Sequence, residues 1–444
     1  MLAMKATLKV LRNAGRKSLA PAASTITRQV LPNGLVVIAE SMPHTHSISL
    51  GLWVRSGSRS ESERLNGIAH FIEHMVFKGT SRRTAEQIAK EMDSVGGMLD
   101  AFTSKESVCF NAKVLHEHLP LAFDVISDLA LRPLFAEEDI AKERQVILEE
   151  IRMEEDNPES VAHELLTKNF WRGHSLGAPI LGTRSTARRF TRAALTDCFR
   201  TWYAPKNLLL TAAGRIEMPQ LLELASSAFG ALKPGKRAPH SASAPTPHGL
   251  LAARNKPTLE QAHITIALPS NPLADPRRFA TSLLNNILGG GMSSRLFQNI
   301  REQQGLAYAV FSELTPYQDA GMLSIYAGTA RQNVEKVLRL IAVELCRMKQ
   351  ELVSEEELRR AKDHFRGAMV LSLESSGARM SHLARQEMYF GRFFTIEELQ
   401  ASIEAVTREQ IQQIAREFFR PEKIAAAVVG PLKGFHLRRD LLAC

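Results

Sequence analysis

The feature of this 444-residue sequence that most constrains its fold is an internal duplication. Short patterns recur in the same order at a nearly constant offset of 216 to 218 residues, which an unrelated second half would not show. The matching pairs are Ile48, Leu50 and Leu52 with Ile264, Ile266 and Leu268, Glu137-Glu138 with Glu355-Glu356, Thr191-Arg192 with Thr407-Arg408, Trp202-Tyr203 with Phe418-Phe419, Pro205 with Pro421, and Gly214 with Gly430. The duplication predicts two copies of one domain of roughly 200 residues.

Each copy is predicted to combine β-hairpins with long helices. Alternating apolar residues indicate strands, and longer stretches with helical spacing indicate helices. In the first copy we expect strands at 48–54, 98–103 and 108–112, helices at about 116–131 and 136–156, a helix at about 66–78 that stops at Gly79, and a helix that begins with a capping box of Thr84 and Gln87. Hairpins with clustered helices favour an α+β fold, with an antiparallel sheet packed with helices in each domain.

Composition predicts the limits of the domains. Residues 1–24 are basic and contain no acid, and residues 233–257 are rich in Pro, Ser, Ala and Gly, as in an extended linker. We therefore expect a disordered N-terminal segment at 1–24, a first domain at 25–232, a linker at 233–257, a second domain at 258–436 and a tail at 437–444.

The charge distribution argues against a nucleic-acid partner. Residues 1–39 contain six Lys and Arg and no acid, so only +3 of the net charge of +9 belongs to the rest of the chain. A phosphate-binding surface needs basic residues in the folded body. No apolar run approaches the roughly 20 residues of a membrane helix, so we expect no membrane partner.

Four widely spaced cysteines without a CxxC pair favour a reducing compartment. We expect the cytoplasm of a bacterium. The mitochondrial matrix is the alternative, because residues 1–24 have the composition of a transit peptide.

The most specific chemical signal is the pattern His70-Phe71-Ile72-Glu73-His74. On a helix, residues i and i+4 share a face, so both imidazoles can bind one cation. Two imidazoles and a carboxylate suit zinc, with the fourth position open for water. Such a metal would lower the pKa of the water, Glu73 would take its proton, and the hydroxide would attack a polarised carbonyl.

A third ligand would distinguish this site from two surface histidines beside a glutamate. The predicted helix at 136–156 offers candidates, since Glu143 and Glu150 lie two turns apart on one face. Glu150 and Glu154 also share a face, whereas Glu149 points about 100° away from Glu150. Helical phase alone therefore leaves three acids open.

These residues resemble a known family. GIAHFIEHMVFKGT, followed 76 residues after His74 by the second Glu of ERQVILEEI, resembles the inverted-zincin peptidases of the pitrilysin and mitochondrial processing peptidase family, closest to the short single-chain bacterial members. The resemblance covers about residues 26–434. It implies a zinc metalloendopeptidase with one zinc ion per chain, held by His70, His74 and Glu150. It further implies Glu73 as general base and Glu143 as an acid that orients the ligands.

The second copy lacks these ligands. At an offset of 218 residues, Leu288–Met292 stands where His70–His74 would recur, and Ala361 and Ala368 stand in place of the two helix glutamates. Its glycines, Gly289–Gly291, lack the Lys-Ser/Thr of a P-loop and predict a turn between helices. We expect one copy to carry the metal and the other to carry none.

The second copy does contain the segment SSRLFQNIREQQGLAY. In it, Arg301 and Tyr308 match the arginine–tyrosine pair of the family, which implies that they contact the substrate carbonyl and help to stabilise the oxyanion. Without the resemblance, they would be interpreted as an exposed helix residue and a residue at a sheet edge.

The strand after Gly96-Gly97 is predicted to bind substrate by strand addition, and the resemblance implies the same segment. Its residues are Leu99, Asp100, Ala101, Phe102 and Thr103. Main-chain pairing selects weakly for side chains, so unstructured peptides or presequences are the expected substrates. The acids Glu154, Glu155 and Asp156 either favour peptides with Arg or Lys or form a solvated helix end.

The resemblance also implies a dimer. Relatives with one site per chain form clam-shell dimers, so we expect a homodimer in which Arg301 and Tyr308 act across the interface. One alternative is a mitochondrial presequence-processing subunit that forms a heterodimer with a related chain, which residues 1–24 would favour. Another is a non-catalytic scaffold, which the intact HxxEH pattern disfavours.

Overall fold

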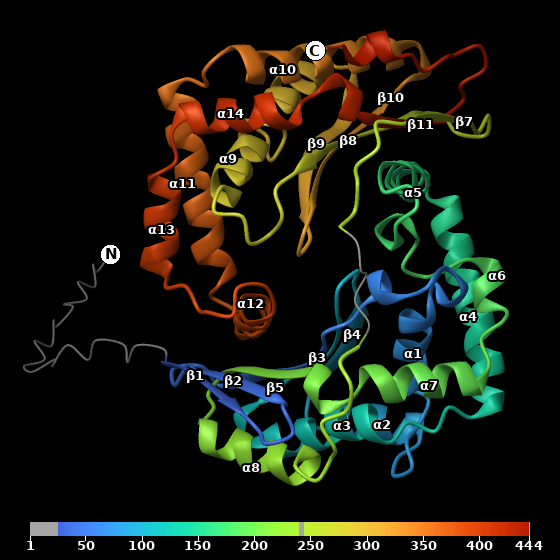
Figure 1. Cartoon of the computed structure of the whole chain (residues 1–444), viewed down its shortest axis with the longest axis vertical. Coiled ribbons are helices and arrows are strands. Elements are labelled where there is room, and N and C mark those ends of the chain that lie inside the picture. Colours follow the sequence, from blue (N-terminus) through green and yellow to red (C-terminus); the bar gives the residue numbers. More distant parts are fainter. Residues whose placement is uncertain (1–24, 239–243, 444) are drawn as a thin grey trace, which may run out of the picture.

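The computed structural model describes residues 25–238 and 244–443, arranged as two sheets with their helices (Figure 1). The prediction for residues 1–24 lies outside the described residues, as does part of the predicted linker. The first sheet has the order β1-β2-β6-β3-β5-β4 and the second has the order β7-β11-β8-β10-β9. Once β1 is set aside, the second sheet repeats the first strand by strand, as the duplication predicts.

The elements of the first half are β1 (Thr25–Val30), β2 (Val36–Ser41), β3 (Ser47–Val54), α1 (Ile68–Val76), α2 (Ala85–Ser94), β4 (Met98–Thr103), β5 (Val108–Leu115), α3 (Leu119–Leu131), α4 (Glu137–Asp156), α5 (Pro158–Phe170), α6 (Arg184–Ala187), α7 (Arg192–Trp202), β6 (Leu208–Gly214) and α8 (Met218–Phe229). None of the helices in the described part of the chain is long and apolar enough to cross a bilayer.

The elements of the second half are β7 (Leu251–Asn255), β8 (Ala262–Ser270), α9 (Arg278–Leu288), a π-helix (Phe297–Gln303), β9 (Ala307–Pro316), β10 (Gly321–Thr329), α10 (Val334–Gln350), α11 (Glu355–Ser372), α12 (Ser376–Tyr389), α13 (Ile396–Glu404), α14 (Arg408–Phe418) and β11 (Ala425–Gly430).

The predicted fold of two sheets packed with helices is confirmed, with one correction. The sheets are not purely antiparallel, because β2 pairs in parallel with β6 and β7 pairs in parallel with β11. Each parallel pair joins the first strand of a repeat to its last. That pairing spans most of the repeat, so no local pattern could have predicted it.

Local predictions agree closely with the structure, except at one helix. The capping box of Thr84 and Gln87 and the strand at 98–103 are present. The helix expected at 66–78 is shorter, because it begins after Gly67, and Phe77 follows its last residue. Gly79 lies in an isolated bridge with Thr84 instead of ending the helix.

Each sheet has a core of its own on one face, and its other face is covered by a helix from the other half. Helix α12 packs Met380, Leu383 and Ala384 against the first sheet, where the hydroxyl of Ser376 bonds that of Ser49 at 2.9 Å. Helix α5 packs against the second sheet, where Thr265 Oγ1 donates to the carbonyl of Ala162 at 3.1 Å (Figure 1). Each half thus contributes one helix that covers the sheet of the other half. The predicted domain limits stay predictions.

Candidate metal centre

The helix that carries the HxxEH pattern is fixed at its first turn. Gly67 has φ +93°, and a Cβ there would lie 2.6 Å from the carbonyl oxygen of Leu181. The buried carboxylate of Glu61 accepts from the backbone N–H groups of Gly67 at 2.8 Å and Ala69 at 2.9 Å, so it satisfies donors that α1 leaves unpaired.

Sequence reasoning missed Glu61, because it stands six residues before Gly67, beyond the usual capping positions. Burial raises the pKa of Glu61 to about 7, although its hydrogen bonds with the backbone N–H groups of Ala69 and Gly67 act to lower it.

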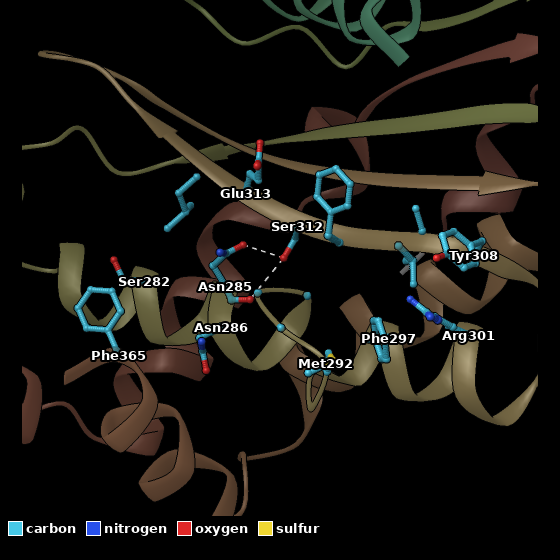
Figure 2. Close-up of a pocket in the computed structure, with 17 residues that line it drawn as sticks. Ser282, Asn285, Asn286, Met292, Phe297, Arg301, Tyr308, Ser312, Glu313 and Phe365 are labelled. Carbon is cyan, nitrogen blue, oxygen red and sulfur yellow. Dashed lines mark hydrogen bonds between the residues drawn. The ribbon is translucent and has the colours of Figure 1, made fainter. Parts of the chain in front are cut away.

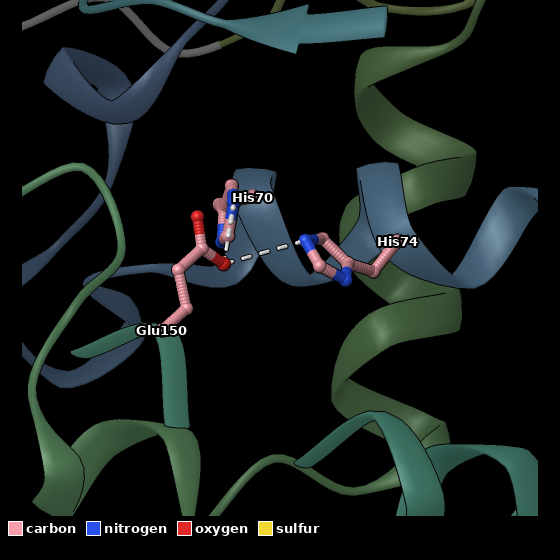
Figure 3. Close-up of side chains that lie close together, drawn as sticks. All are labelled: His70, His74 and Glu150. Atoms are coloured by element: carbon pink, nitrogen blue, oxygen red, sulfur yellow. Dashed lines mark ion pairs between the residues drawn. The ribbon is translucent and has the colours of Figure 1, made fainter. Parts of the chain in front are cut away.

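Helices α1 and α4 bring His70, His74 and Glu150 together (Figure 3). The Nε2 atoms of both histidines lie 3.6 Å from the same oxygen of Glu150, Oε2, and the imidazole centroids lie 4.6 Å apart. One ligand atom from each of the three residues lies within 4.8 Å of the others, and this is the one such group in the described ranges.

These distances fit a small cation. Zn²⁺ binds nitrogen and oxygen at about 2.0–2.2 Å in tetrahedral sites, which sets neighbouring ligand atoms roughly 3.3–3.6 Å apart. The separations of 3.6 Å between imidazole nitrogen and carboxylate oxygen match that spacing. Burial, and secondarily the charge of His74, lowers the pKa of His70 to about 4, so its imidazole is neutral at pH 7 and offers a lone pair.

Glu143 contacts this cluster through His74, on the side of the imidazole that faces away from Glu150. His74 donates from Nδ1 to the carboxylate of Glu143 at 3.1 Å, which leaves the Nε2 lone pair directed at the site. Lys78 pairs with the other oxygen of Glu143 at 2.9 Å. The structure therefore separates acids that helical phase left open, since Glu150 faces both imidazoles, Glu143 holds one of them, and Glu154 is exposed outside the cluster.

Glu73 lies beside the two histidines and contacts the strand β4. Thr103, at the end of β4, donates its hydroxyl to Oε2 of Glu73. Burial raises the pKa of Glu73, the hydrogen bond from Thr103 opposes this, and the charges of Glu150 and Asp100 add to it. The predicted substrate strand is thus bonded directly to the predicted general base.

The strand β4 is an edge of the first sheet, next to β5 alone. Its residues alternate between exposed and half-buried side chains, and Met98 and Phe102 are among the exposed ones. An edge strand presents unpaired N–H and C=O groups, which a second extended chain can pair with.

Arg301 and Tyr308 lie in the second half and not at the cluster. The Cζ atom of Arg301 stacks 4.7 Å from the ring centroid of Phe297 and 4.8 Å from that of Tyr308. Both line a pocket of about 920 Å³, with Phe365 at its other end (Figure 2). Within the described residues, no hydrogen bond, ion pair or ring contact joins either of them to His70, His74 or Glu150.

The alignment of the two repeats needs a correction at α1. Helix α9 is its counterpart, because α9 packs against α11 and β9 as α1 packs against α4 and β4. Leu288–Met292 therefore lies at the end of α9 and in the turn after it, and a constant offset misplaced it because the loops differ in length. Helix α9 itself contains no His, Asp, Glu or Cys, so the absence of ligands on this helix does not depend on the offset.

Two family models match the chain. The model described as Insulinase (Peptidase family M16) matches residues 36–184, which include His70, Glu73, His74 and Glu150. The model described as Peptidase M16 inactive domain matches residues 189–365, which include Arg301 and Tyr308.

The chain is similar over nearly its whole length to bacterial proteins named as uncharacterized zinc proteases. YmxG of Bacillus subtilis is 38% identical over 91% of this chain and 98% of its own length. SCO5738 of Streptomyces coelicolor is 37% identical over 92% of this chain and 90% of its own length. A protein of Rickettsia felis is 37% identical over 91% of this chain and 98% of its own length.

Solved structures share the fold. A peptidase M16 inactive domain from Pseudomonas fluorescens superposes with a TM-score of 0.85 at 22% identity, over 91% of this chain and 98% of that one. A protease from Helicobacter pylori also gives a TM-score of 0.85, at 20% identity, over 92% of this chain and all of that one.

Proposed function

The chain belongs to peptidase family M16, and we propose from this premise that it is a zinc-dependent endopeptidase that hydrolyses unstructured peptides. The observation that carries the proposal is the convergence of His70, His74 and Glu150 beside Glu73. The names of the relatives, which call them zinc proteases, support zinc as the metal. The single candidate group in the described residues supports one site per chain.

Each residue has a distinct part in the proposed reaction. A bound zinc ion would supply Lewis-acid chemistry, lowering the pKa of water and polarising a carbonyl. Glu73 would take a proton from the attacking water at Oε1, because Oε2 accepts from Thr103. Glu143 would keep His74 in the tautomer that has a lone pair on Nε2.

The substrate would lie along β4. Leu99 to Thr103 form an edge strand, and Thr103 is already bonded to Glu73, so a peptide added to this edge would pass close to the proposed base. Backbone pairing requires an extended chain, which favours unstructured peptides or presequences over folded proteins. The exposed acids Glu154 and Asp156 near Glu150 support a preference for peptides with Arg or Lys, whereas the third predicted acid, Glu155, pairs with Arg184.

Arg301 and Tyr308 have no contact with the cluster in one described chain, so we propose that they act on the site of a second copy in a homodimer. Mixing Glu73→Gln chains with Arg301→Ala chains tests this, since sharing across the interface restores one intact site. A mixture no more active than its two components would contradict it, and activity only with a related chain would favour a heterodimer.

The proposed function is tested by the turnover of a quenched, unstructured basic peptide by wild type and by Glu73→Gln. The change removes the base but keeps both imidazoles, so zinc content should stay unchanged while turnover falls by about a thousandfold or more. A wild type that binds zinc and is as inactive as the variant would contradict a self-sufficient peptidase and favour a scaffold.

A further inference from the structure

A second pocket, separate from the metal cluster, lies between α9, α11, α12 and α13. Its volume is about 340 Å³, within the range of pockets that bind small ligands. Ser282, Leu314 and Phe365 line both this pocket and the one that contains Arg301 and Tyr308. The two pockets are therefore neighbours on the same half of the chain.

The wall of this pocket includes a group of phenylalanine rings. Phe279, Phe365, Phe390 and Phe394 line it, and the guanidinium of Arg278 stacks among them. Its Cζ atom lies 4.4 Å from the ring centroid of Phe279, 4.8 Å from that of Phe390 and 5.1 Å from that of Phe394. Ring stacking uses the faces of a guanidinium and leaves its edge for hydrogen bonds. One of these goes from Nη1 of Arg278 to the carbonyl of Asp275 at 3.3 Å, and the remaining N–H groups are available to a ligand.

The charge that lines the pocket is positive, and no carboxylate in the described part of the chain pairs with it. Arg278 and Arg385 line it, none of its lining residues is acidic, and neither arginine forms an ion pair with a carboxylate of the described residues. The neighbouring Arg277, outside the lining, is by contrast paired with Asp275 and Glu417. His382 adds no charge at pH 7, because burial, followed by the charge of Arg385, lowers its pKa.

The guanidiniums of Arg278 and Arg385, which pair with no carboxylate of the described residues, repel each other. Burial lowers the pKa of Arg278, and the charges of Arg392 and Arg385 lower it further, while Asp275 opposes them. Packing against phenylalanine rings accounts for the position of Arg278 in the pocket, but for that residue alone. It does not explain Arg385, which is exposed and comes from a different helix. A bound anion with an apolar body would compensate both charges and fill the aromatic wall.

We propose that this pocket binds the carboxyl terminus of a peptide whose last side chain is apolar or aromatic. The carboxylate lies between Arg278 and Arg385, and the side chain packs on the phenylalanine rings. The choice of a peptide rests on the proposed function, since a peptidase meets free carboxyl termini on its substrates and creates them in its products. The rest of such a peptide would extend into the adjoining pocket, which Arg301 and Tyr308 line.

Calorimetry with two matched probes tests the proposal without any need for turnover. The probes are N-acetylphenylalanine and its C-terminal amide, which differ only in the negative charge. In the wild type the acid should bind about tenfold more tightly than the amide, and Arg385→Gln should remove this preference. Arg385→Lys should restore part of it, since the charge remains.

The matched control is Arg392→Gln. This arginine lies beside the pocket, stacks on Phe394 at 4.1 Å and pairs with Glu398, but it does not line the cavity. It should change the preference less than about twofold, because it lies outside the cavity and its charge is already paired with Glu398. Equal weakening by Arg385→Gln and Arg392→Gln would overturn direct contact with the carboxylate.

Two further results would overturn the proposal. One is equal binding of the acid and the amide by the wild type, and the other is octanoate binding as tightly as N-acetylphenylalanine, which would assign the pocket to free fatty acids. Failure of the pocket is distinguishable from failure of the peptidase, because binding and peptide turnover are measured separately. Unchanged thermal unfolding of Arg385→Gln would show that a loss of binding is not a loss of fold.

Discussion

At the scale of single residues, the proposed metal site depends on the groups that orient the proposed ligands as much as on the ligands themselves. His74 is oriented by Glu143, which is itself held by Lys78, and α1 begins where Gly67 and Glu61 fix its first turn. Helical phase made Glu143 a candidate and the resemblance implied its role, but nothing in the sequence pointed to Glu61. Its role depends on a chain reversal before α1 that leaves no periodic signal.

The substitution Gly67→Ala tests this fixed turn. We expect it to lower the free energy of unfolding by about 2–4 kcal/mol, because alanine is strained at φ +93° and its Cβ would meet the carbonyl of Leu181 at 2.6 Å. Gly173→Ala is the matched control, since Gly173 has φ +80° and no atom within 4 Å of an added Cβ. The control should cost only about 1 kcal/mol. Urea unfolding of both variants measures the difference, and equal losses would contradict the role of the close approach.

At the scale of elements, the sequence predicted those structures whose signals are local. The capping box at Thr84 and the strand at 98–103 follow from spacing within a few residues. The parallel pairing of β2 with β6 and the covering of each sheet by a helix from the other half depend on contacts between distant residues. For the same reason, helical phase left the third acid open. The resemblance implied Glu150, and the packing of α1 on α4 places Glu150 against both histidines.

The contact between α1 and β4 gives a prediction at this scale. Thr103→Val removes the hydroxyl that donates to Glu73 but keeps the shape of the side chain. We expect kcat to fall about tenfold with zinc content unchanged, because the proposed base loses the group that orients it. Thr103→Ser, which keeps the hydroxyl, should retain most of the activity. If valine and serine at this position are equally active, the hydrogen bond does not position Glu73.

At the scale of the whole molecule, the two halves are held together by exchanged helices and by charges at their junction. Arg59 from the first half contacts Glu106 in its own half and Asp319 in the second, each at 2.6 Å. Glu387 on α12 pairs with Arg28 at 2.9 Å and with Arg55 at 3.4 Å. The ion pairs of Glu387 hold α12 in place. One face of this helix covers the first sheet, and other residues of the helix line the aromatic pocket.

The junction should weaken in acid. Burial acts to raise the pKa of Glu387, but the hydrogen bond from Arg28 and the charges of Arg28 and Arg55 outweigh it, so the pKa lies below the ordinary 4.5. A lowered folded-state pKa stabilises the fold above about pH 4.5 and loses this effect as pH falls further. The contribution is about 1 kcal/mol or less, because Arg28 is 42% exposed and solvent screens it.

Urea unfolding of wild type and Glu387→Gln between pH 7 and pH 3.5 measures this contribution. The wild type should be the more stable at pH 7, and the difference should shrink toward zero as Glu387 becomes protonated. A difference that is constant across this range would show that the charge of Glu387 does not stabilise the junction.

The central claim is that His70, His74 and Glu150 form a zinc site, and the zinc content of purified variants tests it most directly. Glu150→Gln alters a proposed ligand, whereas Glu154→Gln alters an exposed acid one turn along the same helix. We predict one zinc ion per chain in the wild type and in Glu154→Gln, and a loss of at least tenfold in zinc affinity in Glu150→Gln. Equal zinc affinity in the two variants would contradict the site.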